Sequence, residues 1–248
     1  MREVSQLVGH PNHFDSITAV GQAWLRDSML ALMSALWYGC TRQSVSARFW
    51  QLATQVIKGT ISQEGLCGEP RPPEVWRQLE RLCGHSLSSF EARGRWSNPT
   101  DFADTDLACL PINHDNLMYN IRNWLVSNAK QAHFAVRANV RGMGDKTTGL
   151  LLRDVAWVYG LEGRGSLAQA SQAIYIQPVD IWVWRLAECL WPDLKGKRDW
   201  KVIASRIIVE CRQAGVSAIR FNQGAWYFGA RIVKTANQFC SRLAMLNG

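Results

Sequence analysis

Apolar residues recur at intervals of three and four along most of the chain. Two clear runs are Leu25, Met29, Leu32, Met33, Leu36 and Trp37, and then Phe49, Leu52, Ala53 and Val56. These intervals match the 3.6-residue turn of an α-helix, and the alternation that is typical of strands is scarce. Glycine and proline divide the pattern into about nine or ten helices, which predicts an all-α fold.

The segment from about residue 60 to 112 has the weakest helical period and the most turn residues, as in EPRPP, HSLSS and RGRWSNPTDF. Such stretches are typical of loops. We interpret the segment as a linker between two helical lobes or as an insertion. The predicted organisation is an N-terminal helical region over residues 1–112 and a second region over 113–248.

The charge of the chain is strongly basic. It has 28 Lys and Arg against 20 Asp and Glu in 248 residues, a net charge of +8, which favours nucleic acid or an anionic membrane surface as a partner. The opening MREVSQLVGHPNHFDS does not have the regions of a secretory signal peptide, and Arg26 and Asp27 interrupt the most apolar candidate helix. We therefore expect a cytoplasmic protein that does not insert into a membrane.

Seven cysteines are scattered along the chain without any C-x-x-C pair, which argues against a disulfide framework. Structural zinc and iron–sulfur clusters need closely spaced thiolates, so neither is expected. The five histidines also show no spacing typical of a metal site. The cysteines are predicted to be reduced and buried, and no metal is expected.

A glycine-rich turn joins two predicted helices in VRGMGDKTTGLLLRDV, residues 140–155. Gly142 and Gly144 can adopt left-handed backbone angles and allow close approach of another backbone. The N–H groups of residues 144 to 147 would point outward at the positive end of the second helix, where a phosphate binds readily. The turn therefore indicates a clamp on one DNA phosphate, helped by nearby cations at Lys130, Arg137 and Arg141.

The alternative for this segment is an ordinary turn between packed helices, with Lys146 facing solvent. His133, which precedes the turn, is expected to be a surface histidine, although it could hydrogen-bond a phosphate.

A second motif, QPVDIWVWR, places Asp180 where the N-cap of a helix is expected. An N-cap side chain accepts hydrogen bonds from the first free N–H groups and contributes about 0.5–2 kcal/mol of stability. Capping alone could explain this aspartate. It does not prevent the carboxylate from taking part in chemistry.

Together these motifs resemble the helix-hairpin-helix superfamily of DNA glycosylases, in which a G-x-G-x-K hairpin is followed by a V-D element that opens a later helix. RGMGDKTTGLLLRDV is closest to the archaeal and bacterial 8-oxoguanine glycosylase/lyase branch, which has no iron–sulfur cluster. The resemblance covers about residues 129 to 190. It implies two helical lobes with the active-site cleft between them, with residues 1–112 helping to recognise the base and 113–248 forming the catalytic region.

The resemblance assigns Lys146 as the nucleophile and Asp180 as the essential aspartate. A carboxylate stabilises the positive charge that develops on the sugar as the N-glycosidic bond breaks. A neutral lysine can attack the same carbon, and the resulting Schiff base leads to strand cleavage by β-elimination. The presence of Lys146 therefore predicts a glycosylase that also has lyase activity.

The remaining implied contacts follow from the same family. The hairpin residues expected to contact DNA are Arg141, Gly142, Gly144, Asp145 and Thr147, and Arg153 and Asp154 of the L-R-D pattern are expected to be internal supports. The partner is double-stranded DNA that contains a modified base, and the protein is expected to act as a monomer. No cofactor is implied, apart from a monovalent cation at the hairpin.

The target base must leave the helical stack before its bond can be broken, and aromatic side chains can then stack on it. Trp157, Trp182, Trp184 and Trp226 lie on segments that approach the base pocket in the family. They are the candidate stacking residues. Packing in the core is the alternative for each of them.

Three functions from different classes stay open at this point. The first is a repair glycosylase and lyase for an oxidised purine such as 8-oxoguanine, which the resemblance implies. The second uses the same chemistry on a bulky hypermodified base in phage DNA, as an antiviral defence. The third is a non-catalytic helix-hairpin-helix DNA-binding protein, against which Lys146 and Asp180 both count, because binding alone needs neither.

Overall fold

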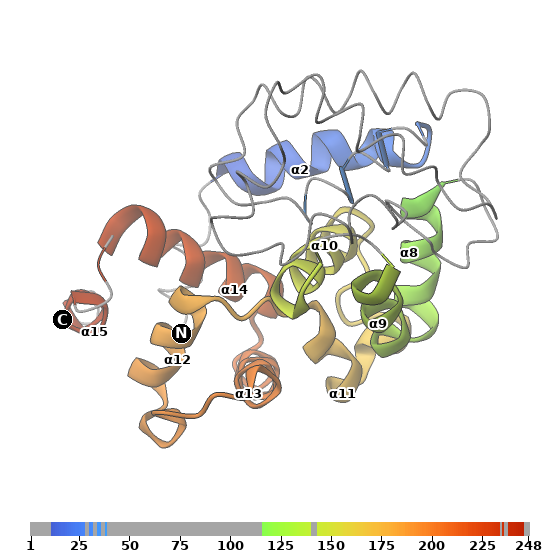
Figure 1. Ribbon diagram of the computed structural model, residues 1–248. Coiled ribbons are helices and arrows are strands. Elements are labelled where there is room, and N and C mark those ends of the chain that lie inside the picture. Colours follow the sequence, from blue (N-terminus) through green and yellow to red (C-terminus); the bar gives the residue numbers. More distant parts are fainter. Residues whose placement is uncertain are drawn as a thin grey trace, which may run out of the picture.

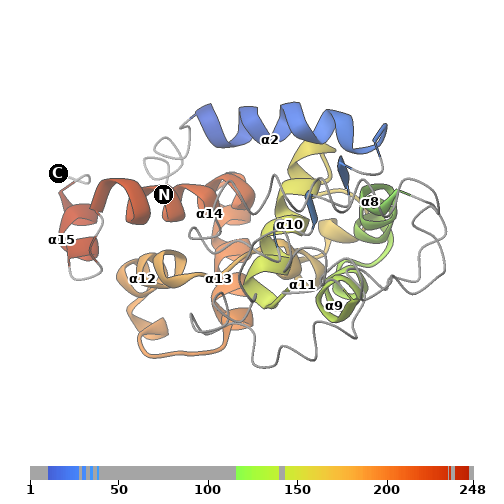
Figure 2. The same cartoon turned by 45° about the horizontal axis from the view of Figure 1, so that its top comes forward.

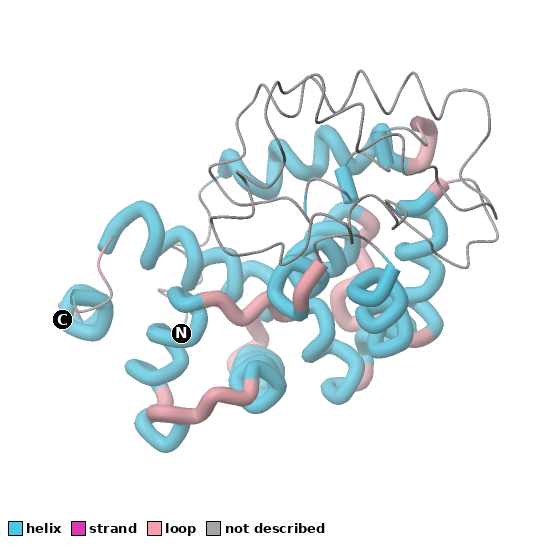
Figure 3. Tube along the Cα trace, in the orientation of Figure 1, coloured by secondary structure: helices cyan, strands magenta, loops and turns pink. Residues whose placement is uncertain are grey.

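The computed structural model describes residues 11–27, 30–31, 34–35, 38, 116–139, 143–233, 235 and 238–245. All regular elements in these ranges are helical, with no strand among them, which confirms the all-α prediction (Figures 1 and 3). The predicted boundary at residue 112 and the turn-rich segment before it lie outside these ranges. None of the described helices has both the length and the apolar character needed to cross a membrane.

The described residues form short and medium helices, and the elements named here are those of the described ranges. The α-helices are α2 (Pro11–Trp24), α8 (Leu117–Ser127), α9 (Ala129–Asn139), α10 (Asp145–Val158), α11 (Ala170–Ala173), α12 (Ile181–Leu190), α13 (Trp200–Gln213), α14 (Ala218–Tyr227) and α15 (Phe239–Ala244). Shorter turns of 3-10 helix are η1 (Gly165–Ala168), η2 (Ile174–Ile176) and η3 (Pro192–Leu194), and η4 (Phe228–Val233) is π-helical.

Local side-chain chemistry determines where several helices begin and end. Asn116, Asp199 and Ser217 cap α8, α13 and α14 by accepting a hydrogen bond from an N–H group in the first turn. Beyond the ends of α10 and α13, Gly160 (φ 61°) and Gly215 (φ 64°) adopt the left-handed conformation that is common after a helix. These boundaries depend only on neighbouring residues.

Within the described ranges, buried apolar side chains form two clusters. The first cluster draws mainly on α8, α9 and α10, with Trp24 of α2, and the second mainly on α12, α13, α14 and α15. Ile174 in η2 packs against both clusters. In Figures 1 and 2, α8 and α9 lie on the opposite side of the molecule from α12 and α15, with α10 between them. The segment that follows η2 therefore leads from the first cluster to the start of α12.

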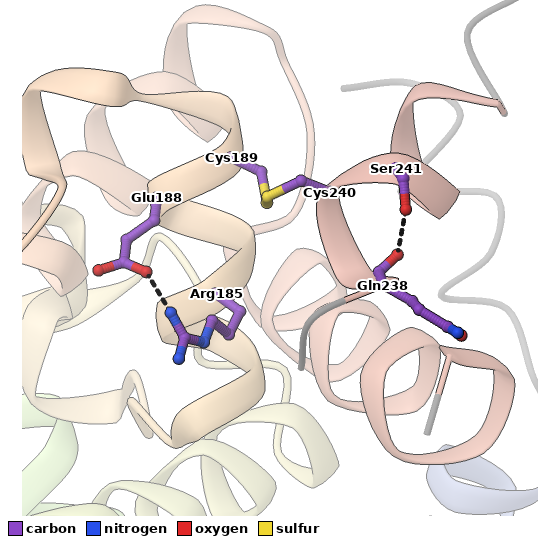
Figure 4. The surroundings of a disulfide bond; sticks show 6 residues. All are labelled: Arg185, Glu188, Cys189, Gln238, Cys240 and Ser241. Atoms are coloured by element: carbon purple, nitrogen blue, oxygen red, sulfur yellow. Dashed lines mark hydrogen bonds and ion pairs between the residues drawn. A yellow bond between two sulfur atoms is a disulfide. The ribbon is translucent and has the colours of Figure 1, made fainter. Parts of the chain in front are cut away.

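A disulfide joins Cys189 of α12 to Cys240 of α15, with their Cα atoms 5.5 Å apart (Figure 4). This corrects the prediction that the cysteines are all reduced. The two residues are 51 positions apart in sequence and meet only because α15 packs against α12. Cys211 is buried and free, as predicted.

Reduction of the Cys189–Cys240 disulfide is expected to lower the free energy of unfolding by about 2–4 kcal/mol, because the cross-link restricts the unfolded chain. Urea unfolding with and without a reductant measures the effect. The double variant Cys189→Ser, Cys240→Ser is the control, since its midpoint should not respond to the reductant. A wild-type midpoint that is equally unresponsive would contradict the prediction.

Candidate active site at the starts of α10 and α12

Asp180 is the N-cap of α12, as the sequence predicted. Its backbone is extended (φ −99°, ψ −176°), and its Oδ1 accepts hydrogen bonds from the N–H groups of Trp182 (2.9 Å) and Val183 (3.0 Å). The other carboxylate oxygen, Oδ2, takes part in neither bond. The helix start therefore orients the carboxylate through one of its two oxygens.

Burial raises the pKa of the Asp180 carboxyl above its ordinary value of 3.8. The N–H groups of Val183 and Trp182 oppose this rise, as do the positive charges of Lys146 and Arg153. Lys146 therefore lies close enough to Asp180 to stabilise its ionised form. The charge of Lys146 thus acts on Asp180 although the two residues belong to different helices.

Replacing Lys146 with glutamine is expected to raise the pKa of Asp180 further, because a favourable charge is lost. Because the pKa of Asp180 is higher in the folded than in the unfolded protein, its titration contributes to the free energy of unfolding below the unfolded pKa. That contribution is lost as the pH rises through the folded pKa. A carbon-13 NMR titration of the carboxyl group measures the shift directly. Lys197→Gln is the control, because Lys197 is not among the charges that act on Asp180. An unchanged pKa in Lys146→Gln would contradict the placement of this lysine.

Lys146 is exposed and is the second residue of α10. The first helical hydrogen bond of α10 runs from the N–H of Thr148 to the carbonyl oxygen of Gly144 (2.9 Å). The N–H groups of residues 145 to 147 therefore precede the helical bonds and face the start of the helix. A ligand that reaches Lys146 meets these donors as well.

Gly149 places α10 directly against the segment that leads to Asp180. A Cβ atom there would lie 3.2 Å from the N atom and 3.3 Å from the Cα atom of Pro178, closer than most contacts of this kind. The absence of a side chain at Gly149 thus lets the two backbones touch, one turn after Lys146. Sequence analysis missed this residue, although an isolated glycine within a helical pattern is a signal for close packing.

A buried polar network also supports the segment that leads to Asp180, through Asn222 of α14. Arg153 donates two hydrogen bonds to Asp154 (3.0 and 2.8 Å) and one to Asn222 of α14 (3.2 Å), whose amide group donates to the carbonyl oxygen of Pro178 (3.0 Å). Tyr38 donates to the second oxygen of Asp154 (2.7 Å). Arg153 and Asp154 are therefore internal supports, as the resemblance implied. Asn222 is a further support that sequence analysis did not find.

Asp145 ties the start of α10 to α9. Its Oδ1 lies 3.1 Å from Nε2 of His133 and 3.2 Å from Nη1 of Arg137. His133 is fully buried rather than at the surface, which corrects the prediction, and its Nδ1 lies 3.2 Å from the carbonyl oxygen of Tyr175. Burial lowers the pKa of His133 below its ordinary value. This histidine therefore holds the two helices together and does not face a ligand.

The predicted DNA-binding cations of α9 are exposed. Lys130 and Arg137 are seven residues apart, about two helical turns, and so lie on one face of α9. Arg137 is also held by its ion pair with Asp145. The third predicted cation, Arg141, and its neighbour Gly142 lie outside the described residues.

The described half of the turn differs from the predicted geometry in one respect. Gly144 has an extended backbone (φ −112°, ψ 178°) rather than a left-handed one, and its N–H donates to Oγ1 of Thr147 (2.8 Å). Thr147 is buried, so its side chain shapes the turn from inside. A Cβ atom at Gly144 would meet nothing within 4 Å, and the backbone there is open to an approaching group.

Trp182 is used in packing. Its ring covers Gly229 of η4 and stacks on Phe239 of α15, with ring centroids 6.2 Å apart. This packing fixes the first turn of α12 against the second apolar cluster. Among the four candidate aromatic residues, Trp182 is the one nearest Asp180 in sequence.

The other three candidate tryptophans are half-buried, and each has an arginine over its ring. The guanidinium carbon lies 5.1 Å from the ring centroid for Arg220 over Trp157, 5.3 Å for Arg198 over Trp184, and 5.9 Å for Arg231 over Trp226. A base could stack on such a ring only on the opposite face, or after the arginine moves.

Comparisons with known proteins identify no relative: no protein-family model, no curated protein and no solved structure matches this chain. Within the described ranges, no group of three or more histidine, cysteine or acidic side chains could hold a metal ion.

Proposed function

We propose that this protein is a DNA glycosylase that extrudes a modified base from double-stranded DNA, excises it, and cleaves the strand through Lys146. The observation that carries this proposal is that the N-capping, half-buried carboxylate of Asp180 lies within the electrostatic influence of the exposed Lys146, on a segment that packs against α10 at Gly149. A nucleophilic amine and an oriented carboxylate are the two groups that this reaction needs. A protein that only binds DNA needs neither of them.

In the proposed reaction, Asp180 acts on the sugar of the target nucleotide. As the bond between the sugar and the base breaks, positive charge develops on the sugar ring, and the ionised carboxylate stabilises it. The N–H groups of Trp182 and Val183 hold Oδ1, so that the carboxylate does not need to reorient as the charge appears. The first turn of α12 thus holds the carboxylate in place before the reaction begins.

Lys146 would form the covalent intermediate. Its neutral amine attacks the sugar carbon, the base leaves with the electron pair of the glycosidic bond, and the amine proton is lost. Asp180, whose pKa is raised by burial, is the nearby group suited to accept that proton. The bond between C1′ and the ring oxygen then breaks, the ring oxygen takes up a proton, and a Schiff base to the opened sugar is left. Loss of a proton from C2′ expels the 3′ phosphate by β-elimination and cuts the strand.

DNA binding is proposed at the turn between α9 and α10, which would act as the helix-hairpin-helix motif. The N–H groups of residues 145 to 147 and the open backbone at Gly144 would hold one phosphate, with Lys130 and Arg137 adding positive charge. The two apolar clusters would correspond to two lobes, with the cleft at the segment that leads to Asp180. The net charge of +8 supports a polyanionic partner.

The proposed substrate is an oxidised purine such as 8-oxoguanine, on the strength of the resemblance in residues 140–155 and 177–185. The same groups would act equally well on a hypermodified base in phage DNA, since neither Lys146 nor Asp180 contacts the base. The residues that contact the base therefore set the substrate, and with it the role in repair or in defence.

The test is to incubate the purified protein with four DNAs, with and without borohydride. They are duplexes that contain 8-oxoguanine or a preformed abasic site, an unmodified duplex, and genomic DNA from a phage that hypermodifies cytosine. Strand cleavage at 8-oxoguanine with a trapped adduct would support repair, and abasic sites only in the phage DNA would support defence. Binding without base release from any of them would leave the non-catalytic alternative and refute the proposal.

A further inference from the structure

The side chain of Gln177 is buried, yet its polar atoms are unsatisfied. Gln177 is 2% exposed, and neither Oε1 nor Nε2 has a hydrogen-bond partner among the residues that the structure describes. Its backbone N–H, in contrast, has a partner and donates to the carbonyl oxygen of Ile174 (3.1 Å). Buried amide groups are bonded in most proteins, and an unpaired one destabilises the fold. Such a group is often retained for a ligand.

Gln177 lies on the segment that leads to Asp180, where this segment packs against α10. It is three residues before Asp180, so their Cα atoms are at most about 10 Å apart. Its carbonyl carbon would be 3.4 Å from a Cβ atom at Gly149, one turn after Lys146. If the sugar sits between Lys146 and Asp180, the base attached to that sugar projects beyond them. Gln177 is the buried polar side chain on this segment that has no partner within the described ranges.

We propose that Gln177 reads the hydrogen-bonding edge of the excised base. This inference rests on the proposed glycosylase function and adds a specificity residue to it. A glutamine amide offers a donor beside an acceptor, and it pairs through two hydrogen bonds with a base edge that carries an acceptor beside a donor. An extruded base is read through its edge in this way. The ligand class is thus a nucleobase with neighbouring donor and acceptor atoms.

The substitution Gln177→Met separates this role from a purely structural one. Methionine has a similar size but no group that needs a hydrogen bond in this position, so the Tm is expected to rise by about 2–4 °C. Single-turnover base excision is expected to fall by about 10- to 100-fold, because two bonds to the base are lost. Strand cleavage at a preformed abasic site, where there is no base to read, should stay within about twofold of wild type.

Gln172→Met is the matched control. The Oε1 atom of Gln172 already accepts a hydrogen bond from the N–H of Lys130 (2.9 Å), so this oxygen has a partner within the protein. Its replacement is expected to leave the Tm unchanged or lower, and base excision unchanged. If Gln177→Met does not fold, Gln177→Leu serves in the same comparison.

The substrate in these assays is whichever of the 8-oxoguanine duplex and the hypermodified phage DNA the wild-type protein processes. Base excision by Gln177→Met at the wild-type rate would overturn the inference and leave the glycosylase function in place. An equal loss of excision and of abasic-site cleavage would also overturn it, since the residue would then position the site rather than read the base. No excision by the wild type from either DNA would refute the glycosylase function itself.

Discussion

Replacing Lys146 with glutamine is expected to abolish strand cleavage and the adduct trapped by borohydride, a loss of more than about 1000-fold. The reason is chemical, because an amide nitrogen cannot form a Schiff base with the opened sugar. DNA affinity should fall by less than about tenfold, since one exposed cation is lost from a larger basic surface. Borohydride trapping and a gel-shift titration on the same duplex measure the two effects.

Lys197→Gln is the control for charge alone, because Lys197 is exposed and lies in the loop between α12 and α13. It should form the adduct at the wild-type rate. A trapped adduct in Lys146→Gln at the wild-type level would assign the nucleophile to another amine and contradict the proposed site.

Asp180→Asn is expected to slow base release by about 100- to 1000-fold, the usual loss when a preorganised charge is removed from an active site. DNA binding should change little. Asparagine also caps helices well, so the free energy of unfolding should stay within about 0.5 kcal/mol of wild type. Single-turnover excision and thermal unfolding of the same preparation separate catalysis from stability.

The variant Asp180→Ala removes the cap as well as the charge, and it should cost a further 0.5–2 kcal/mol or so of stability. Asp199→Asn is the matched control, because Asp199 caps α13 through the N–H of Lys201 (2.9 Å) but is not among the charges that act near the site. Base release at the wild-type rate in Asp180→Asn would show that this carboxylate is only a cap. Equal losses of DNA binding in Lys146→Gln and Asp180→Asn would refute both assigned roles.

The sequence by itself determined the local structure of this protein. The helical period, the glycine after α10 and the Asp180 cap all depend on residues within about one turn of each other, and the structure confirms the all-α fold and that cap. A cap is predictable because the side chain and the N–H groups that it bonds are three positions apart or fewer. The same reasoning picked out Lys146 at the start of α10.

Only the tertiary structure decided what these local features do together. Lys146 acts on Asp180 because Gly149 lets α10 touch the backbone at Pro178, and because Asn222 of α14 holds that segment from behind. The burial of His133 and the pairing of Cys189 with Cys240 arise in the same way, from helices that are distant in sequence. Such contacts depend on which faces pack together, and a periodic pattern identifies an apolar face without identifying the face that it will meet.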